Sequence, residues 1–234
     1  LVSDAGFVGC HHFGLMERPE VLDRAAPGAT LLVNSSEAPD KVWDALARPI
    51  QERMIEKGIE LYVIDAGRIA RDAGLAGRTN TVLQTCFFAI SGVLPRPDAV
   101  ERIKASIEHT YRRRGAEVVD RNIQAVDRAL DGLHRVDLPD RPTSEHDVRP
   151  IVADHAPEFV RLVSAKMMVG HGDELPVSAL PVDGTYPSGT TKYEKRNISE
   201  VVAEWDPDLC IQCGNCSVVC PHSVIRTRYY DSSR

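Results

Sequence analysis

The chain has 234 residues, the length of one or two ordinary domains, which is enough to bury a substantial hydrophobic core. Hydrophobic residues make up 43% of it and no apolar run approaches the roughly 18 residues of a membrane-spanning helix, so we expect a globular chain rather than a disordered or membrane-spanning one. Its 28 basic and 34 acidic residues give a net charge of -6, which disfavours broad, non-specific binding to nucleic acid or anionic lipid.

The first residues of the given sequence do not show the basic and apolar pattern of a secretory signal. The sequence begins at Leu1 rather than at a methionine and continues as ordinary core-like sequence, so we expect a piece of a longer protein. Of the six cysteines, Cys10 and Cys86 stand alone, and this is not the arrangement of disulfide pairs. Unpaired thiols without a secretory signal are typical of a reducing compartment, and we expect the protein in the cytoplasm.

Three short apolar runs in the first part of the chain predict β-strands, at residues 6–10, 30–34 and 60–65. In the second and third runs the apolar residues are continuous rather than alternating with polar ones. A strand of this composition is covered on both faces, as the strands of parallel sheets are. We therefore expect a parallel sheet.

Three amphipathic patterns predict helices after the third strand. The first helix is expected to end at Pro95 and the second to begin at Asp98 as its N-cap. The cations of residues 112–114, followed by Gly115, suit the negative C-terminal end of the second helix better than a phosphate site. Alternating strands and helices predict an α/β domain with a Rossmann-like parallel sheet over residues 1–138. The apolar positions expected on the three helices are Val82, Leu83, Cys86, Phe87, Ile90, Val93 and Leu94, then Val100, Ile103, Ile107 and Tyr111, then Val119, Ile123, Val126, Leu130 and Leu133.

Seven prolines between residues 139 and 190 mark a change in organisation. Proline is unfavourable in helix interiors and central strands, so we expect an irregular, proline-rich connector, bounded at residues 139–203. One helical pattern lies inside it, at residues 158–169. Its apolar face is expected to consist of Phe159, Leu162, Val163 and Met167.

The strongest motif is a four-cysteine run near the C-terminus. Its spacing, C-x2-C-x2-C-x3-C followed by proline, is that of bacterial 4Fe-4S ferredoxin modules. Two-residue gaps let a tight loop place three thiolates around one cluster, and Gly214 permits a sharp bend that brings backbone amides close to the cluster. The predicted ligands of iron-sulfur clusters are therefore Cys210, Cys213, Cys216 and Cys220.

The fourth cysteine of such a run ligates the other cluster in two-cluster modules. We therefore expect Cys210, Cys213 and Cys216 to share one 4Fe-4S cluster and Cys220 to serve a second one. The cysteine run that would complete the second cluster is not in this sequence. On its own the chain is expected to hold iron poorly.

Other metal assignments fit the cysteines less well. A structural zinc site more often uses two C-x2-C pairs separated by a longer loop, unlike this compact run. Cys10 is followed by His11 and His12, but adjacent side chains on a strand point to opposite faces and do not easily ligate one ion. Cys86 lies on the apolar face of a predicted helix, and its expected role is core packing.

Several blocks along the whole chain resemble one known family. Residues 61–66 (LYVIDA) and 78–95 (RTNTVLQTCFFAISGVLP) resemble the γ-type domain of pyruvate:ferredoxin (flavodoxin) oxidoreductases. Residues 175–187 lead to residues 192–197 (KYEKRN), which resemble the Glu-Lys-Arg connector of that family, and residues 205–207 (WDP) resemble the start of its ferredoxin-like insertion. The order of the blocks also matches.

The resemblance implies an internal slice of a much longer enzyme. It implies a γ-type α/β domain at residues 1–138, the connector at 139–203, and half of a ferredoxin-like 4Fe-4S domain at 204–234. Members of the family decarboxylate pyruvate with thiamine diphosphate and Mg²⁺, transfer the acetyl group to coenzyme A, and pass electrons through 4Fe-4S clusters to ferredoxin or flavodoxin. The thiamine-binding domains of the family lie outside this slice, so no catalytic residue is expected here and the chain alone should be inactive.

The resemblance also implies a homodimer of the complete chain. From the charge and the absence of a long apolar run we expect no nucleic-acid or membrane partner. For Glu194, Lys195 and Arg196, two roles stay open: an interdomain salt-bridge patch, or a part in docking the electron acceptor. The alternative for the whole chain is a stand-alone iron-sulfur electron-transfer subunit of another 2-oxoacid oxidoreductase. The missing second cysteine run disfavours that alternative.

Overall fold

The computed structural model describes residues 2, 4–194, 202–228 and 231 of the chain. Contacts divide the chain into two compact units, Leu1–Ile198 and Ser199–Arg234, and each is described by itself. The first unit holds a sheet domain and the proline-rich connector, and the second holds the four-cysteine run. Within the described residues, every helix is too short or too polar to span a bilayer.

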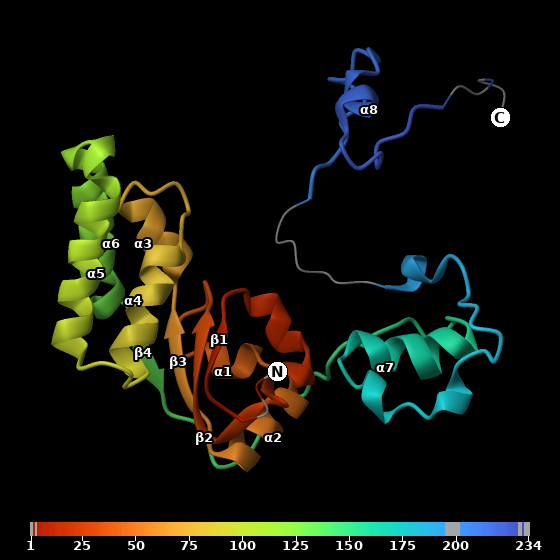
Figure 1. Cartoon of the computed structure of the whole chain (residues 1–234), viewed down its shortest axis with the longest axis horizontal. Helices are drawn as coiled ribbons and strands as arrows, with labels where there is room; N and C mark the ends of the chain where they lie inside the picture. The colour runs from red at the N-terminus through yellow and green to blue at the C-terminus, as the bar shows by residue number, and fades with distance from the viewer. Residues whose placement is uncertain (1, 3, 195–201, 229–230, 232–234) are drawn as a thin grey trace. The chain divides into compact units, whose positions relative to one another are not determined.

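The first unit is built on a four-stranded sheet with the order β1-β2-β3-β4 (Figure 1). Its strands are β1 (Ala5–Cys10), β2 (Ala25–Asn34), β3 (Glu60–Ile64) and β4 (His134–Val136). The first three strands are parallel, and pairs such as Leu31 with Leu61 and Val33 with Val63 are in register. The predicted α/β fold and its three predicted strands are confirmed.

The sheet differs from the expected one in two places. The three predicted strands are parallel as expected, and a fourth strand that was not predicted, β4, runs antiparallel to β3, with Val136 beside Leu61. It has three residues, and two of them are exposed, so it lacks the apolar pattern on which strand prediction depends. β2 also starts at Ala25 rather than near Thr30, because a bulge containing Gly28 at φ +73° shifts its pairing with β1.

Short helices connect the parallel strands. The connections contain η1 (Phe13–Glu17) and η2 (Pro19–Leu22) before β2, then α1 (Val42–Ala45) and α2 (Arg48–Lys57) before β3. α2 ends at Gly58, whose φ of +61° forms a left-handed cap that glycine adopts without steric cost. The N–H of Gly58 donates to the carbonyl of Ile55 at 3.1 Å, and the chain then turns directly into β3.

Alternate residues of β2 enter two different cores. Leu31 and Val33 pack on the side of α1 and α2, whereas Leu32 packs on the opposite side together with Ile64. Both faces of the sheet are therefore covered, as the continuous apolar runs predict. Full burial of one such side chain stabilises the fold by about 1.5–3 kcal/mol. The first core also contains Met16, Leu22, Trp43, Ile50 and Met54, and the second Ile69, Val82, Leu83, Cys86, Ala125 and Ala129.

The second face of the sheet is covered by α3 (Ala66–Asp72), α4 (Asn80–Ile90) and α6 (Ala116–Asp131). α5 (Arg96–Tyr111) packs against α4 and α6, and the short turn η3 (Arg112–Arg114) follows it. Asp65 caps α3, because its Oδ1 accepts a hydrogen bond from the N–H of Arg68 at 2.8 Å. α5 and α6 lie side by side (Figure 1) and enclose Ile103, Ile107 and Val126.

The end of α4 corrects the expected helix. α4 stops at Ile90 rather than at Pro95, so Val93 and Leu94, which were expected on its buried face, are 64% and 37% exposed. Gly92 follows at φ +69° and takes the backbone out of helical geometry. The apolar pattern therefore runs past the point at which the glycine ends the helix.

The start of α5 corrects a second expectation. Its N-cap is Pro95 and its first residue is Arg96, so Asp98 lies in the first turn rather than at the cap. Pro97 favours this earlier start, because proline has no N–H to leave unpaired in a first helical turn. Asp98 still complements the positive end of the helix.

The proline-rich connector is tied to the sheet domain by a buried glutamine. Gln51 on α2 is fully buried, and its Oε1 accepts hydrogen bonds from the N–H groups of Thr143 at 2.8 Å and Ser144 at 2.9 Å. Its Nε2 donates to the carbonyl of Trp43 at 2.6 Å. One side chain thus satisfies three backbone groups that burial would otherwise leave without water.

The connector has a small hydrophobic core of its own, formed by Val152, Ala156 and Val160 with flanking apolar residues. Its elements are a π-helical turn labelled η4 (Val160–Ser164), α7 (Ala165–Met168), η5 (Gly172–Glu174), η6 (Val177–Ala179) and η7 (Thr190–Tyr193).

The helical face expected in the connector is wrong in part. Val163 is buried, but Leu162 is 58% exposed and Met167 is 49% exposed, while Val160 takes an inward position. A π-helical turn forms i→i+5 hydrogen bonds and so changes the angle between successive side chains. The i, i+3, i+4 spacing used for the prediction therefore selects the wrong face.

Candidate iron-sulfur site

The backbone before the first cysteine is held in a turn by Asp206. The Oδ1 of Asp206 accepts hydrogen bonds from the N–H groups of Asp208 at 2.9 Å and Leu209 at 3.3 Å. Its backbone carbonyl accepts from the N–H of Cys210 at 3.1 Å. Aspartate side chains commonly stabilise turns by bonding to the backbone two residues on, and this turn positions Cys210.

Two left-handed residues bracket the second cysteine. Gln212 has φ +56° and Gly214 has φ +73°, so the chain bends sharply on both sides of Cys213. The bend at Gly214 is the one the sequence predicts. The carbonyl of Gly214 then accepts the N–H of Ser217 at 3.0 Å, starting the short helix α8 (Asn215–Val219).

The four cysteines differ in exposure. Cys210 and Cys220 are partly buried, whereas Cys213 and Cys216 are exposed. Across the described residues, no three Cys, His, Asp or Glu side chains converge closely enough to hold a metal ion. The structure thus brings the four predicted ligands into one short loop-and-helix segment without gathering their sulfur atoms at one point.

The first thiol is stabilised in its charged form. A hydrogen bond with the Trp205 side chain is the main influence that lowers the pKa of Cys210 below its usual value, and a hydrogen bond with the backbone at Gln212 lowers it further. Because the indole N–H is a donor only, it favours a thiolate acceptor. Cys210 therefore has a local environment that suits a metal-ligating thiolate.

The fourth thiol is surrounded by backbone donors. Hydrogen bonds with the backbone at Ile225, Val224 and His222 lower the pKa of Cys220 below its usual value. Of these, the N–H of Val224 donates to the Sγ of Cys220 at 3.4 Å. N–H groups directed at a ligand sulfur stabilise its negative charge and also tune the reduction potential of a bound cluster.

The donor set fits an iron-sulfur cluster. Cluster iron is held by thiolates, and this segment offers four within eleven residues, two of which have N–H groups that favour deprotonation. The positive-φ residues beside Cys213 supply the sharp bends that such a loop requires. When bound, the cluster would supply one-electron redox chemistry, and the residues of this chain would hold it and set its electrostatic surroundings.

The other two cysteines have the opposite environment. Burial raises the pKa of Cys10 to about 11 and that of Cys86 to about 12. Both side chains lie in hydrophobic cores, and the Sγ of Cys10 donates to the carbonyl of His12 at 3.1 Å. The predicted core role of Cys86 is confirmed, and both thiols stay protonated at neutral pH.

Of the Glu-Lys-Arg residues, the structure describes Glu194 only; Lys195 and Arg196 lie outside the described residues. Glu194 lines a cavity of about 460 Å³ together with Glu17, Arg18 and Arg149. The roles considered for this tripeptide stay predictions.

The sequence prediction missed the groups that act on the thiols. Trp205 and the backbone N–H groups after Cys220 were not among the predicted site residues. The N–H groups carry no residue-type signal, because any residue but proline supplies one. Trp205 did carry a signal: an indole N–H donor five residues before a ligating cysteine.

A mostly parallel α/β domain followed by a cysteine run of this spacing defines the class, an α/β protein with a 4Fe-4S binding segment. Protein-family models match residues 1–132 as pyruvate ferredoxin/flavodoxin oxidoreductase, residues 145–199 as a domain of unknown function termed EKR, and residues 202–225 as a 4Fe-4S binding domain. Because the first match alone covers more than half of the chain, the chain belongs to the pyruvate ferredoxin/flavodoxin oxidoreductase family. The predicted resemblance is confirmed.

Curated relatives match along nearly the whole chain. The chain is 49% identical over 234 residues to a putative pyruvate-flavodoxin oxidoreductase of Synechocystis, and 50% identical over 228 residues to a pyruvate-flavodoxin oxidoreductase of Rhodospirillum rubrum. The two alignments cover 100% and 97% of this chain, but only 20% and 19% of the two relatives. The chain therefore spans about a fifth of the length of these relatives.

Among solved structures, a pyruvate oxidoreductase subunit of Thermotoga maritima is similar to the chain. The alignment has a TM-score of 0.45 and 21% identity, and it covers 58% of this chain and 67% of that subunit.

Proposed function

We propose that this chain is the part of a pyruvate:ferredoxin (flavodoxin) oxidoreductase that carries the γ-type α/β domain, the connector and the first cysteine run of a two-cluster ferredoxin-like domain. Its role is electron transfer: to hold iron-sulfur clusters between the site of pyruvate oxidation and the electron acceptor. The observation that carries this proposal is the C-x2-C-x2-C-x3-C-P run, with N–H groups that favour the thiolate at its first and fourth cysteines.

Within this proposal the four cysteines have separate tasks. Cys210, Cys213 and Cys216 ligate one 4Fe-4S cluster, and Cys220 reaches a second cluster completed by another part of the protein. The donors near Cys210 and Cys220 act on different clusters and therefore tune different potentials.

The rest of the reaction belongs to the complete protein. Thiamine diphosphate with Mg²⁺ would supply the decarboxylation of pyruvate outside this chain, coenzyme A would take the acetyl group, and ferredoxin or flavodoxin would accept the electrons. We further propose a homodimer of the complete protein in the cytoplasm, where the free thiols of Cys10 and Cys86 would stay reduced.

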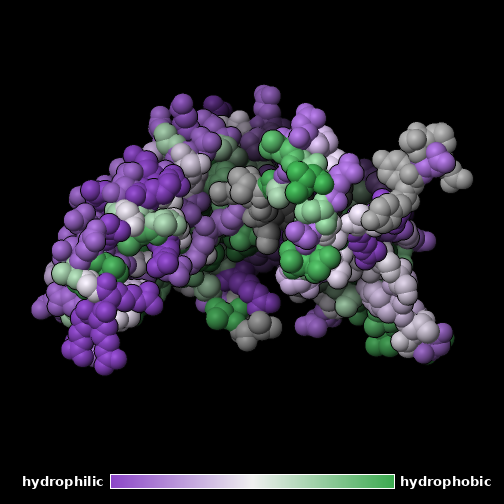
Figure 2. Space-filling model, turned by 90° about the horizontal axis from the view of Figure 1, so that it is seen from above, coloured by the Kyte–Doolittle hydropathy of each residue, from purple (hydrophilic) through white to green (hydrophobic). Residues whose placement is uncertain are grey.

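We propose domain boundaries at residues 1–138, 139–203 and 204–234. Hydrophobic surface is exposed on the face of the protein seen in Figure 2. Exposed apolar side chains after residue 138 support contacts with further domains of a longer protein. Those of the connector and the second unit include Val177, Val182, Val202, Trp205, Leu209, Ile211 and Val218.

The test is Cys213→Ser in the complete enzyme. Because the hydroxyl of serine is a poor ligand for cluster iron, we expect the fold to persist while the cluster is lost and ferredoxin reduction collapses. The measurements are iron content and the rate of ferredoxin reduction with pyruvate and coenzyme A.

Asn215→Ser is the matched control. Asn215 lies on α8 between Cys213 and Cys216 and is exposed, so the same residue type is introduced without removing a thiol. We expect near-normal iron content and ferredoxin reduction from this variant. Normal ferredoxin reduction by Cys213→Ser would overturn the proposed function.

A further inference from the structure

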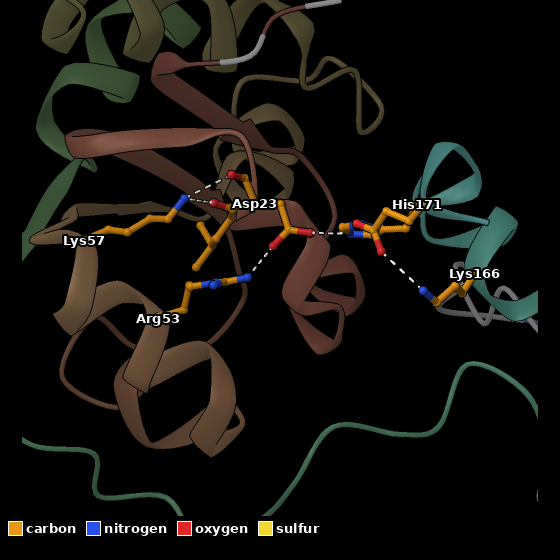
Figure 3. Close-up of polar contacts among 7 residues, drawn as sticks. Asp23, Arg53, Lys57, Lys166 and His171 are labelled. Atoms are coloured by element: carbon orange, nitrogen blue, oxygen red, sulfur yellow. Dashed lines mark hydrogen bonds and ion pairs between the residues drawn. The ribbon is translucent and has the colours of Figure 1, made fainter. Parts of the chain in front are cut away.

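One histidine of the connector lies between two carboxylates from different parts of the first unit. His171 follows α7, and its Nε2 is 2.9 Å from the Oδ2 of Asp23 in the sheet domain. Its Nδ1 is 2.5 Å from the Oε1 of Glu174, three residues further along the connector. Figure 3 shows His171 pointing toward Asp23, which precedes β2.

Both contacts require a proton on the histidine ring. A carboxylate is an acceptor only, so each ring nitrogen must donate to satisfy the oxygen that faces it. A neutral imidazole has one N–H and therefore serves one carboxylate, leaving a lone pair directed at the other. The observed geometry is that of the doubly protonated, positively charged ring.

Each carboxylate also has a second cationic partner. Arg53 on α2 lies 2.5 Å from the Oδ1 of Asp23, and Lys166 on α7 lies 3.3 Å from the Oε2 of Glu174 (Figure 3). Asp23 and Glu174 thus keep a charge partner when the histidine is neutral. Loss of the ring proton therefore weakens the contacts of His171 with the two carboxylates, while the ion pairs with Arg53 and Lys166 remain.

The loop that presents Asp23 is fixed in place. Lys57 at the end of α2 donates to the carbonyls of Leu22 at 2.7 Å, Asp23 at 3.0 Å and Ala25 at 2.7 Å. Because these bonds and the Arg53 pair hold Asp23 on the sheet domain, the element free to move when the contact weakens is the connector.

The contact joins two bodies with separate cores. The connector packs Val152, Ala156 and Val160 together, apart from the cores of the sheet domain. The exposed ion pair of Arg149 with Glu17, at 3.4 Å, also bridges the two, and the cavity of about 460 Å³ is lined by residues from both sides, including Gly14 and Met168. The way the connector sits on the sheet domain therefore sets the shape of this cavity.

We propose that His171 is a proton-dependent clasp that fastens the connector onto the sheet domain through Asp23. The charged ring bridges Asp23 and Glu174 and holds the segment around α7 in place. Loss of the ring proton leaves the local contact with Glu174 and releases the contact with Asp23, which loosens the connector and the cavity beneath it.

The shifted pKa of His171 gives the direction in which the stability of its contact with Asp23 changes with pH. Hydrogen bonding to Glu174 and then to Asp23 raises the pKa of His171 above its usual value, and the hydrogen bond with His171 lowers the pKa of Glu174. A raised histidine pKa gives stabilisation that is complete below the ordinary value of 6.5 and is lost as the pH rises through the raised value. The clasp is therefore closed at mildly acidic pH and opens toward alkaline pH.

The test follows the ring and the connector together in the full 234-residue chain. Nitrogen-15 NMR reports the protonation of both ring nitrogens of His171 between about pH 5 and about pH 9. Hydrogen exchange, expressed as protection relative to unstructured peptide, reports how firmly residues 160–175 are held. We expect the pKa of His171 to lie above the ordinary histidine value of 6.5, and this segment to lose protection as His171 deprotonates.

Two variants and one control complete the experiment. In His171→Gln the side chain is neutral at every pH, so hydrogen-exchange protection of the connector should be low and should not change as the pH rises. We expect the same of Asp23→Asn, in which His171 keeps its local contact with Glu174. His109→Gln, on the exposed face of α5, should behave as the unchanged chain does. Unchanged protection of α4 and α6 shows that each variant is folded.

Two results would overturn the clasp. One is a His171 ring that titrates at the ordinary histidine value of 6.5 rather than above it. The other is a connector in His171→Gln that is protected as in the unchanged chain at every pH. Both are independent of ferredoxin reduction, so they leave the proposed electron-transfer function untouched.

Discussion

At the scale of single residues, the six cysteines fall into two groups by environment. Cys10 and Cys86 are buried and their raised pKa values keep them as thiols, whereas N–H donors lower the pKa values of Cys210 and Cys220. The grouping was predictable from sequence, because the ligand cysteines follow a fixed spacing and Cys86 follows a helical one. The donors were not predictable, because they are mostly backbone groups.

Gln51 is the residue whose role sequence could least reveal. A polar residue in a helix is ordinarily exposed, yet this one is fully buried and binds backbone groups from Trp43, Thr143 and Ser144. Replacing it by leucine, Gln51→Leu, keeps the approximate volume but leaves these groups unpaired. We expect a loss of about 1–3 kcal/mol in the free energy of unfolding, measured by urea denaturation.

Gln84→Leu provides the comparison for that substitution. Gln84 lies on α4 with an exposed side chain, so the same change should alter stability by less than about 0.5 kcal/mol. Equal stability of the two variants would show that the Gln51 hydrogen bonds do not hold the connector to α2.

At the scale of elements, periodicity predicted which segments form strands and helices better than it predicted where they end. The strands β1 to β3 and the helices α4 to α6 follow their apolar patterns, since burial on one or both faces requires those patterns. The end of α4 depends instead on the backbone at Gly92, and the face of the connector helix depends on a π-helical turn. Neither is encoded in the spacing of apolar residues.

The turn from α2 into β3 gives an element-scale prediction. At φ +61°, Gly58 has a left-handed backbone that a side chain disfavours by roughly 1–2 kcal/mol, while its added Cβ would meet no atom within 4 Å. Gly58→Ala should therefore lower the free energy of unfolding by about that amount through backbone strain alone. Urea denaturation measures this loss of stability, and we expect the slope of the free energy of unfolding against urea concentration to stay unchanged.

Gly6 in β1 is the matched glycine. Its added Cβ would also meet nothing within 4 Å, and its φ lies outside the left-handed range. Gly6→Ala should therefore cause no loss of stability. If Gly58→Ala were as harmless as Gly6→Ala, the left-handed cap would not be what ends α2.

At the scale of the whole molecule, the sheet domain and the cysteine segment belong to separate compact units. Among the residues that the structure describes, the hydrophobic cores of the sheet domain include none of the four ligand cysteines. We therefore expect the first unit to keep its circular dichroism and its cooperative thermal unfolding after iron is removed with a chelator. A loss of helical signal on iron removal would show that the cluster segment supports the sheet domain.

In the proposed function this chain supplies ligands to two different iron-sulfur clusters, one through Cys213 and its neighbours and the other through Cys220. The most direct measurement is electron paramagnetic resonance of the reduced complete enzyme, comparing Cys213→Ser with Cys220→Ser. We expect each variant to lose or alter the signal of a different cluster. Loss of the same single cluster in both variants would contradict it, because all four cysteines would then ligate one centre.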